Sequence, residues 1–396
     1  MVDLTFSHML ASSTPQLLEM VIKEFAAQTG IHITAIPLDW NDAWTDLIRF
    51  ALYNNGPEIS EIGSTWVGDF VAMNALRPFS SSEVASLGGA DAFIPSIWQS
   101  VMVAQQAQVW SIPWLIDTRL LYYRRDLLEQ AGINPQQAFA TDAVMKHTLQ
   151  SLKDAGGCRA AFCVSTQHTR LTLQNSASWV WGNGGGFVSL DGRQVLLNHP
   201  EALTGFQQYF ELMDFIPEDL RQLDSPQSDR LFAQGQAAVT LSGPWLMRNS
   251  HISAELRDQI GVTFPPGVPF VGGSNLVIWR HCHHLEESLA LVRILTSERF
   301  QQHFLFQIGM LSARAGALNV PPYTQDGFFA HLSEGLQRGR SLPVFPLWGM
   351  VEERLLSTLN QTWNELVSDT SLDRPTFINH RMDRLARQLE IILRGA

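Results

Sequence analysis

The chain has 396 residues, of which 16% are charged, and its 27 Lys and Arg against 38 Asp and Glu give a formal net charge of −11. This acidic balance lacks the electrostatic footprint that binding to a phosphate backbone requires, so we expect no nucleic-acid partner. A chain of this length suggests two to three domains with large cores, and only three cysteines exclude a disulfide scaffold.

The start of the chain has neither the basic nor the apolar region of a signal peptide. A strand pattern begins by Leu4, as expected of a chain whose leader has been removed. No stretch approaches the roughly 18 consecutive apolar residues of a membrane span.

Strand and helix patterns alternate over the first 62 residues. The predicted strands span residues 4–9, 31–37 and 58–62, and the predicted helices span residues 12–30, starting in Ser12-Ser13-Thr14-Pro15, and 41–55. This βαβαβ order predicts an α/β fold with a parallel sheet, in which ligands bind at the carboxyl ends of the strands. Those ends carry Ser7-His8, Asp39-Trp40 and Gly63-Ser64-Thr65-Trp66.

From about Trp114 the pattern changes and indicates a second lobe. An apolar segment at 120–123 and predicted helices at 126–131, 142–154 and 200–214 belong to it. Two predicted strands between 262 and 279 and a predicted helix at 285–295 follow. We interpret the break Pro265-Pro266-Gly267 between those two strands as a crossing between lobes. The last helix is predicted to bury one face, made of Ile378, Met382, Leu385, Leu389 and Ile392.

Five segments in this order resemble the extracellular solute-binding proteins of ABC importers, in the carbohydrate-binding group that includes maltose-binding protein. The segments are EIGSTWVGDF (61–70), SIPWLIDTRLLYYRRDLLEQAGI (111–133), WVWGNGGGFV (179–188), FAQGQAAVTLSGPWLM (232–247) and FVGGSNLVIW (270–279). Their order and spacing over nearly the whole chain carry the resemblance. Two features depart from it: similar proteins often have a Trp where this chain has Ser7, and no lipid-attachment Cys is present.

The resemblance implies a two-lobed clamshell, the fold of periplasmic binding proteins, with three hinge crossings. These crossings are expected near Pro113, near residues 265–269 and near residues 312–316. The first α/β lobe is then expected to comprise residues 1–113 plus 270–314, and the second residues 114–269 plus 315–396 with the C-terminal helices.

The resemblance also implies a non-enzymatic function. A protein of this kind captures a sugar or oligosaccharide between its lobes and delivers it to the permease of an ABC transporter. We therefore expect a periplasmic or extracellular monomer without cofactor or metal. The alternative is a ligand-sensing clamshell module of a signalling receptor. An enzyme is not expected, because the sequence shows no convincing pair of carboxylates for glycoside hydrolysis and neither Gly-x-Ser-x-Gly nor His-Glu-x-x-His.

A sugar presents C–H groups on its faces and hydroxyls at its edge, so its site needs aromatic platforms and planar polar side chains. The chain has 12 Trp and only five Tyr. The candidate ligand-binding residues are Trp245, Asp117, Trp66, Ser64, Thr65, Trp40, Trp179, Trp181, Trp114, Gly273, Ser274, Trp348 and His8. Ordinary core packing is the alternative for about half of such tryptophans, and Trp44, Trp98 and Trp363 are assigned to the core.

Trp245 is the leading candidate, because the resemblance implies that the Gly-Pro-Trp turn after a buried strand aims this ring at the ligand. Asp117 is expected to accept hydroxyl hydrogen bonds, and its alternative is a salt bridge with Arg119 or Arg124. Ser64 and Thr65 contact the ligand or cap a helix.

Four further patterns were weighed. Gly272-Gly273 serves either close approach to a ligand or a hinge. Cys158 and Cys163 form a bridge or stay as thiols. The run from His281 to His284 is interpreted as a solvated turn and not a metal site. Gly184-Gly185-Gly186 lacks the Lys-Ser/Thr of a phosphate-binding loop.

Overall fold

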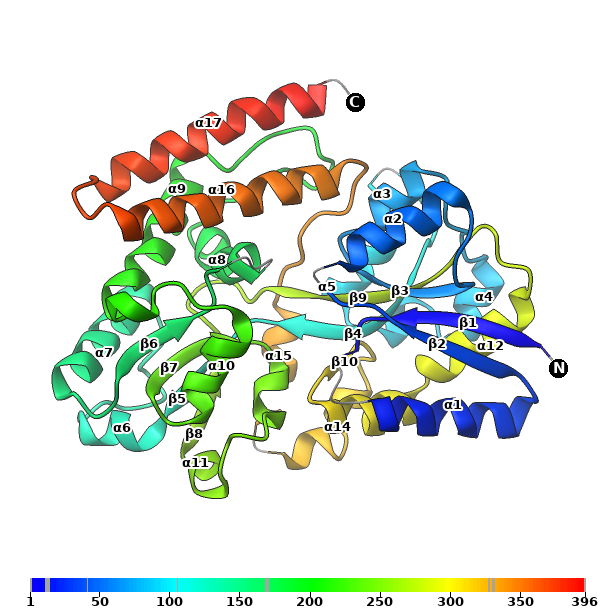
Figure 1. Cartoon of the computed structure of the whole chain (residues 1–396), viewed down its shortest axis with the longest axis horizontal. Coiled ribbons are helices and arrows are strands. Elements are labelled where there is room, and N and C mark those ends of the chain that lie inside the picture. Colours follow the sequence, from blue (N-terminus) through cyan, green and yellow to red (C-terminus); the bar gives the residue numbers. More distant parts are fainter. Residues whose placement is uncertain are drawn as a thin grey trace. The chain divides into compact units, whose positions relative to one another are not determined.

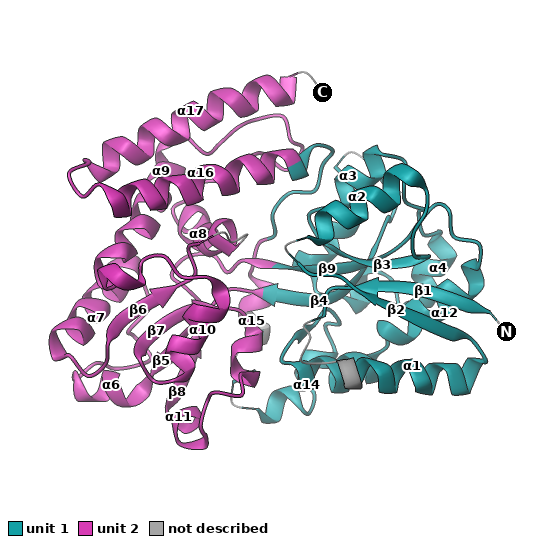
Figure 2. Cartoon of the chain, in the orientation of Figure 1, with its two compact units in different colours: residues 1–117, 272–333, 341–349 teal, residues 118–271, 334–340, 350–396 magenta. Residues whose placement is uncertain are grey.

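The computed structural model describes residues 2–10, 15–40, 42–104, 106–167, 171–326, 328–329 and 332–394. The chain folds into two compact units (Figure 2). Unit 1 comprises residues 1–117, 272–333 and 341–349, and unit 2 comprises residues 118–271, 334–340 and 350–396. The predicted helix start at Ser12-Ser13-Thr14 and the predicted helix residue Asn41 lie outside the described residues.

Unit 1 is built on a six-stranded sheet in the order β10-β4-β9-β3-β1-β2. Its strands are β1 (Asp3–His8), β2 (His32–Pro37), β3 (Ile59–Gly63), β4 (Ile112–Thr118), β9 (Val271–Ile278) and β10 (Leu311–Ser312). The predicted parallel pairing is confirmed for β1 with β2 and for β1 with β3. The sheet as a whole is mixed, because β9 runs antiparallel to β3 and β10 antiparallel to β4.

Helices flank both faces of this sheet, with α1 on one side and α2 and α3 on the other (Figure 1). The helices of unit 1 are α1 (Pro15–Thr29), α2 (Ala43–Tyr53), α3 (Val67–Ala72), α4 (Ser81–Ser86), α5 (Pro95–Trp98), α12 (Leu285–Leu295), α13 (Glu298–Phe300) and α14 (Phe306–Ile308). Helix α2 turns Leu47 inward, where it packs in one core cluster with Ile62, Phe70 and Trp279. Burial of this apolar face stabilises the α2–sheet packing.

Unit 2 contains a four-stranded sheet in the order β6-β7-β5-β8. The strands are β5 (Leu120–Arg124), β6 (Ala160–Val164), β7 (Ala237–Ser242) and β8 (Ile260–Thr263). β6 and β7 are parallel, whereas β5 pairs antiparallel with both β7 and β8. All six residues of β7 are buried, Thr240 and Ser242 included, as expected of an inner strand that is covered on both faces.

The helices of unit 2 are α6 (Arg125–Gln130), α7 (Asp142–Ala155), α8 (Leu171–Gly182), α9 (Pro200–Glu211), α10 (Ser225–Ala233), α11 (Ala254–Gln259) and α17 (Arg374–Arg394). Two further helices, α15 (Leu332–Gln337) and α16 (Trp348–Ser368), include residues of both units. The predicted face of α17 is buried at Ile378, Met382, Leu385 and Leu389, while Ile392 is partly exposed. In the described part of the chain, no helix has both the length and the apolar character of a membrane span.

The chain changes unit near two of the three expected crossings, at residues 117/118 and 271/272. The Pro265-Pro266-Gly267 segment lies inside unit 2, where a Cβ on Gly267 would lie 2.2 Å from the backbone oxygen of Ser178. Gly267 therefore allows the loop to pack directly on α8. Residues 312–316, where the third crossing was expected, lie inside unit 1, which continues to Ser333 and resumes for residues 341–349.

Candidate functional site

In unit 1, hydrogen bonds of the buried Glu61 side chain connect β3 with Ser274 of β9 and with Met9, which directly follows β1. The Glu61 carboxylate is 1% exposed and accepts hydrogen bonds from the Met9 N–H at 2.6 Å and from the Ser274 hydroxyl at 2.5 Å. Burial raises the pKa of Glu61 to about 7, although both hydrogen bonds act to lower it. Ser274 thus bonds to a buried side chain of its own unit, a contact that the sequence did not predict.

His8 and Trp114 are both buried next to Phe6. The two rings lie 5.8 Å from the Phe6 ring, centroid to centroid. Neither His8 Nδ1 nor Trp114 Nε1 has a hydrogen-bond partner among the described residues. Burial lowers the pKa of His8 to about 4, because the imidazolium form would lose its hydration.

An aromatic group of unit 1 comprises Trp40, Trp44 and Trp66. The ring of Trp66 lies 5.7 Å from that of Trp40 and 5.3 Å from that of Trp44, between centroids. Trp66 is buried, whereas Trp40 is 40% exposed. A Cβ on Gly63 would lie 3.0 Å from the Trp66 indole, so this glycine permits the indole to fold back against the end of β3. Of the three, Trp40 presents the most surface to a ligand.

Gly273 brings β9 close to β4. It has φ +141°, and a Cβ there would lie 2.0 Å from the backbone oxygen of Leu115. Its own carbonyl accepts the Ser64 N–H at 2.9 Å. The close approach that this glycine permits is therefore to a neighbouring strand.

Ser64 is buried and Thr65 is partly exposed. The N-cap position of α3 is Trp66, which makes no side-chain capping bond, so neither hydroxyl occupies the capping position. Asp117 is partly exposed at the end of unit 1, and its proposed alternative partner Arg124 forms an ion pair with Asp126 at 2.5 Å.

Trp348 is the first residue of α16 and is fully buried, in an edge-to-face contact with Phe345 at 5.6 Å. The neighbouring Gly349 donates its N–H to Asp69 at 2.9 Å, and burial raises the pKa of Asp69 to about 6. Trp348 was a candidate ligand-binding residue, but the start of α16 packs its indole inside the protein.

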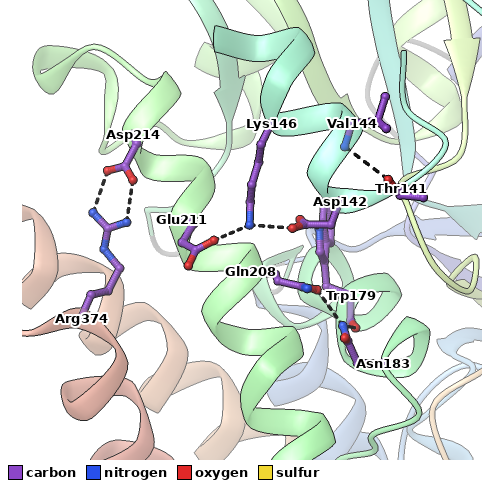
Figure 3. A network of polar contacts seen from close by, with 10 residues as sticks. All are labelled: Thr141, Asp142, Val144, Lys146, Trp179, Asn183, Gln208, Glu211, Asp214 and Arg374. Carbon is purple, nitrogen blue, oxygen red and sulfur yellow. Dashed lines mark hydrogen bonds and ion pairs between the residues drawn. The ribbon is translucent and has the colours of Figure 1, made fainter. Parts of the chain in front are cut away.

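In unit 2, Trp179 belongs to a partly buried polar network (Figure 3). Its indole N–H donates to Asp142 at 3.0 Å, and Asp142 in turn pairs with Lys146 at 2.7 Å. Lys146 also pairs with Glu211 of α9. With 1% exposure and its N–H satisfied, the Trp179 indole ties α8 to α7 in this structure.

Trp181, two residues later, is 5% exposed. Its ring stacks on Phe270 at 6.3 Å, and the Arg340 guanidinium lies over it at 5.2 Å. Both contacts lie next to residue 271, where the chain changes unit.

Trp245 differs from these two because it is partly exposed while its polar edge is held inside unit 2. Its Nε1 donates to Asp229 Oδ2 at 2.9 Å, and the Ser242 hydroxyl donates to Asp229 Oδ1 at 2.6 Å. The guanidinium carbon of buried Arg119 lies 4.9 Å from the centroid of the Trp245 ring. A Cβ on Gly243 would lie 2.1 Å from the same ring. The Gly-Pro-Trp turn therefore needs its glycine for the indole to pack against the backbone.

The structure thus brings the predicted residues together in separate groups. Unit 1 holds His8, Trp40, Ser64, Thr65, Trp66, Trp114, Asp117, Gly273, Ser274 and Trp348, and unit 2 holds Trp179, Trp181 and Trp245. Sequence reasoning missed Arg119 as a partner of Trp245, and it missed Asp229 and Glu61 altogether. A signal for Asp229 existed, because it lies three residues before buried Phe232 and so places a charge on the buried face of α10.

Of the other patterns, the three cysteines are unpaired, and burial raises the pKa of the Cys163 thiol to about 11. His284 Nδ1 lies 2.7 Å from Glu58 Oε1, while His281 Nε2 faces the carbonyls of Gly56 and Pro57. The described residues contain no group of three His, Cys, Asp or Glu side chains that could hold a metal ion.

Comparison with known proteins decides the family. Residues 20–330 match the model of the bacterial extracellular solute-binding protein family. The chain belongs to this family.

Two relatives of this solute-binding protein have assigned ligands. This chain is 22% identical over 300 residues to a maltooligosaccharide ABC transporter solute-binding lipoprotein of Streptococcus pneumoniae. The match covers 72% of this chain and 66% of the relative. The chain is 21% identical over 346 residues to the diacetylchitobiose binding protein DasA of Streptomyces coelicolor, covering 83% of this chain and 77% of the relative.

Solved structures agree on the fold. A solute-binding protein of Thermotoga lettingae bound with alpha-D-tagatose and the maltose-bound MalE3 of T. maritima each have a TM-score of 0.86 and 19% identity. Each match covers 99% of this chain and 100% of the other. At this identity the likeness shows the two-lobed α/β fold, which confirms the fold class predicted from the sequence.

Proposed function

We propose that this solute-binding protein captures a sugar, oligosaccharide or sugar alcohol outside the cytoplasm and hands it unchanged to the permease of an ABC transporter. The observation that carries the proposal is the Trp245 platform: a partly exposed indole whose N–H is fixed to a buried carboxylate. Such a ring offers an apolar face to the C–H groups of a sugar without losing its own hydrogen bond.

Three further observations support a carbohydrate ligand. Trp40 is a second exposed indole, placed after β2 in unit 1. Asp117 and Thr65 are partly exposed polar side chains at the ends of β4 and β3, suited to bonding hydroxyls. The relatives named above bind maltooligosaccharide and diacetylchitobiose, and the solved structures hold tagatose and maltose.

A thermal-shift screen against saccharides and sugar alcohols tests the proposal. Ligand at 100 times its Kd adds about 2.7 kcal/mol of stability, which shifts the melting temperature measurably. If no saccharide or sugar alcohol raises the melting temperature, the proposal is refuted.

For any saccharide that binds, Trp245→Ala is expected to weaken binding by about 1.5 to 3 kcal/mol, or roughly ten- to hundredfold in Kd, through lost apolar contact. Trp98→Ala is the matched control, because Trp98 is also partly exposed but stacks on Phe93 in unit 1 at 5.2 Å. Titration calorimetry should show unchanged affinity for the control. Equal losses in both variants would mean that the defect comes from lost stability and not from the platform.

A further inference from the structure

Two side chains from separate parts of unit 2 converge on the indole of Trp245. Arg119 lies in the link between β4 and β5, Asp229 lies in α10, and Trp245 follows β7. Their contacts are the 2.9 Å hydrogen bond from Trp245 Nε1 to Asp229 and the Arg119 guanidinium 4.9 Å from the ring centroid.

These contacts restrain the ring in two independent ways. A hydrogen bond from Nε1 lies in the plane of the indole, so it fixes the rotation of the ring about its bond to Cβ. A guanidinium over the face opposes any tilt toward or away from it. The Ser242 hydroxyl, which donates to the other Asp229 oxygen at 2.6 Å, fixes the carboxylate itself.

The cluster also contains two opposite charges. Arg119 is fully buried, and the Asp229 carboxylate is almost completely so. Burial raises the pKa of Asp229, while bonds from Ser242 and Trp245 and the charge of Arg119 act to lower it. Removing one of two opposite buried charges takes its field away from the other, which is expected to destabilise the fold more than removing both.

We propose that Asp229 and Arg119 are positioning residues that hold the Trp245 indole in one orientation before the ligand arrives. Arg119 occupies one face of the ring, so a ligand stacks only on the opposite face, and the platform takes a single sugar ring. This inference rests on the proposed function, because it assumes that Trp245 contacts a saccharide. The affinity gain comes from a side chain that does not have to be ordered on binding.

The first test needs no ligand. In protein labelled with ¹⁵N-tryptophan, the Trp245 indole signal is assigned by its loss in Trp245→Phe. We expect this N–H to be shifted downfield and protected from exchange with water in the wild type, and to lose both features in Asp229→Ala. A Trp245 signal that does not change in Asp229→Ala overturns the positioning role, whatever the protein binds.

The second test measures affinity, with maltose as the probe or, if maltose does not bind, the saccharide giving the largest thermal shift. Asp229→Ala is expected to raise Kd roughly three- to tenfold, the cost of immobilising one side chain at each binding event. Asp229→Asn keeps an acceptor for Nε1 and a donor for Ser242, so it should restore affinity to within about twofold of the wild type.

The matched control is Asp224→Ala. Asp224 caps the same helix, α10, by accepting the Gln227 N–H at 2.7 Å. The control should lower the melting temperature and leave both the Trp245 signal and Kd unchanged. If Asp224→Ala lost as much affinity as Asp229→Ala, Asp229 would only stabilise the fold, and its positioning role would be overturned.

Arg119 is tested by a double-mutant cycle with Asp229. Arg119→Met alone should lower the melting temperature more than Arg119→Met combined with Asp229→Asn, because the pair removes both buried charges. Additive effects would overturn the coupling. If no saccharide binds the wild type, the proposed function fails, and this outcome is distinct from failure of the indole test.

Discussion

The buried carboxyl of Glu61 makes the stability of unit 1 depend on pH. Its pKa is about 7 in the folded protein and 4.5 as the reference value, so the folded state binds the proton more tightly than the unfolded chain. The contribution of this carboxyl to the free energy of unfolding is therefore greatest below about pH 4.5 and is lost as the pH rises through about 7. Each unit of pKa difference corresponds to about 1.4 kcal/mol, which gives a loss of roughly 2 to 3 kcal/mol between pH 5 and pH 8.

Glu61→Gln tests this, because glutamine resembles the protonated acid. Its carbonyl oxygen can accept the Met9 N–H, and its amide can donate to the Ser274 hydroxyl. We expect urea unfolding of the variant, followed by circular dichroism at pH 5 and pH 8, to lack that loss of roughly 2 to 3 kcal/mol. Taking the difference between variant and wild type cancels the titration of His8 and Asp69, which both proteins share.

Ser274→Ala is the control for this experiment. It removes one hydrogen bond to Glu61 but keeps the titrating carboxyl, and that bond acts to lower the pKa. The control should therefore be less stable than the wild type and keep at least the same dependence on pH. A wild type and a Glu61→Gln variant with parallel pH profiles would refute the reasoning, because the carboxyl would then titrate alike in the folded and unfolded chains.

Two predictions concern the packing of unit 2, both measured by thermal or urea unfolding. Gly205→Ala should destabilise the protein by about 1 to 3 kcal/mol, because the added Cβ would lie 2.4 Å from Val180 Cα where α8 meets α9. This loss is expected despite the better helix propensity of alanine. Unchanged stability would mean that the two helices can move apart without cost. Trp363→Ala should lower the free energy of unfolding by about 3 to 5 kcal/mol, because this indole is fully buried and donates to the Arg221 carbonyl at 2.7 Å. A loss below about 1 kcal/mol would contradict the assignment of Trp363 to the core.

Most elements were predictable from periodicity, because period 2 and period 3.6 are local properties of a sequence. The helix predicted at 285–295 has the same bounds as α12, and that predicted at 142–154 differs from α7 by one residue. Pairing direction is not local, so the antiparallel course of β9 beside β3 was not predictable. Residues 315–333 were expected in the second lobe but belong to unit 1, and this too depends on contacts that are distant in the sequence.

Side-chain exposure was less predictable than the elements. Trp179 and Trp245 both lie in glycine-containing segments that resemble family motifs, yet one is buried and the other partly exposed. Their indole N–H groups have different acceptors: Trp179 donates to Asp142 of α7, and Trp245 donates to Asp229 of α10. Each acceptor lies 16 or more residues away in the sequence, and no local pattern identifies it.

The two buried carboxyls share similar hydrogen bonds but differ in the charges beside them. Glu61 and Asp229 each accept one serine hydroxyl and one N–H, and burial raises the pKa of both. Asp229 also feels the charge of Arg119, which favours its ionised form, whereas burial and hydrogen bonds alone act on Glu61. The ionised form of Asp229 that Arg119 favours accepts a stronger bond from the Trp245 indole, whereas the pKa of about 7 makes the Glu61 strand junction sensitive to pH. A buried arginine therefore acts in favour of the charge that helps to orient a platform, and Glu61 is suited to titrating.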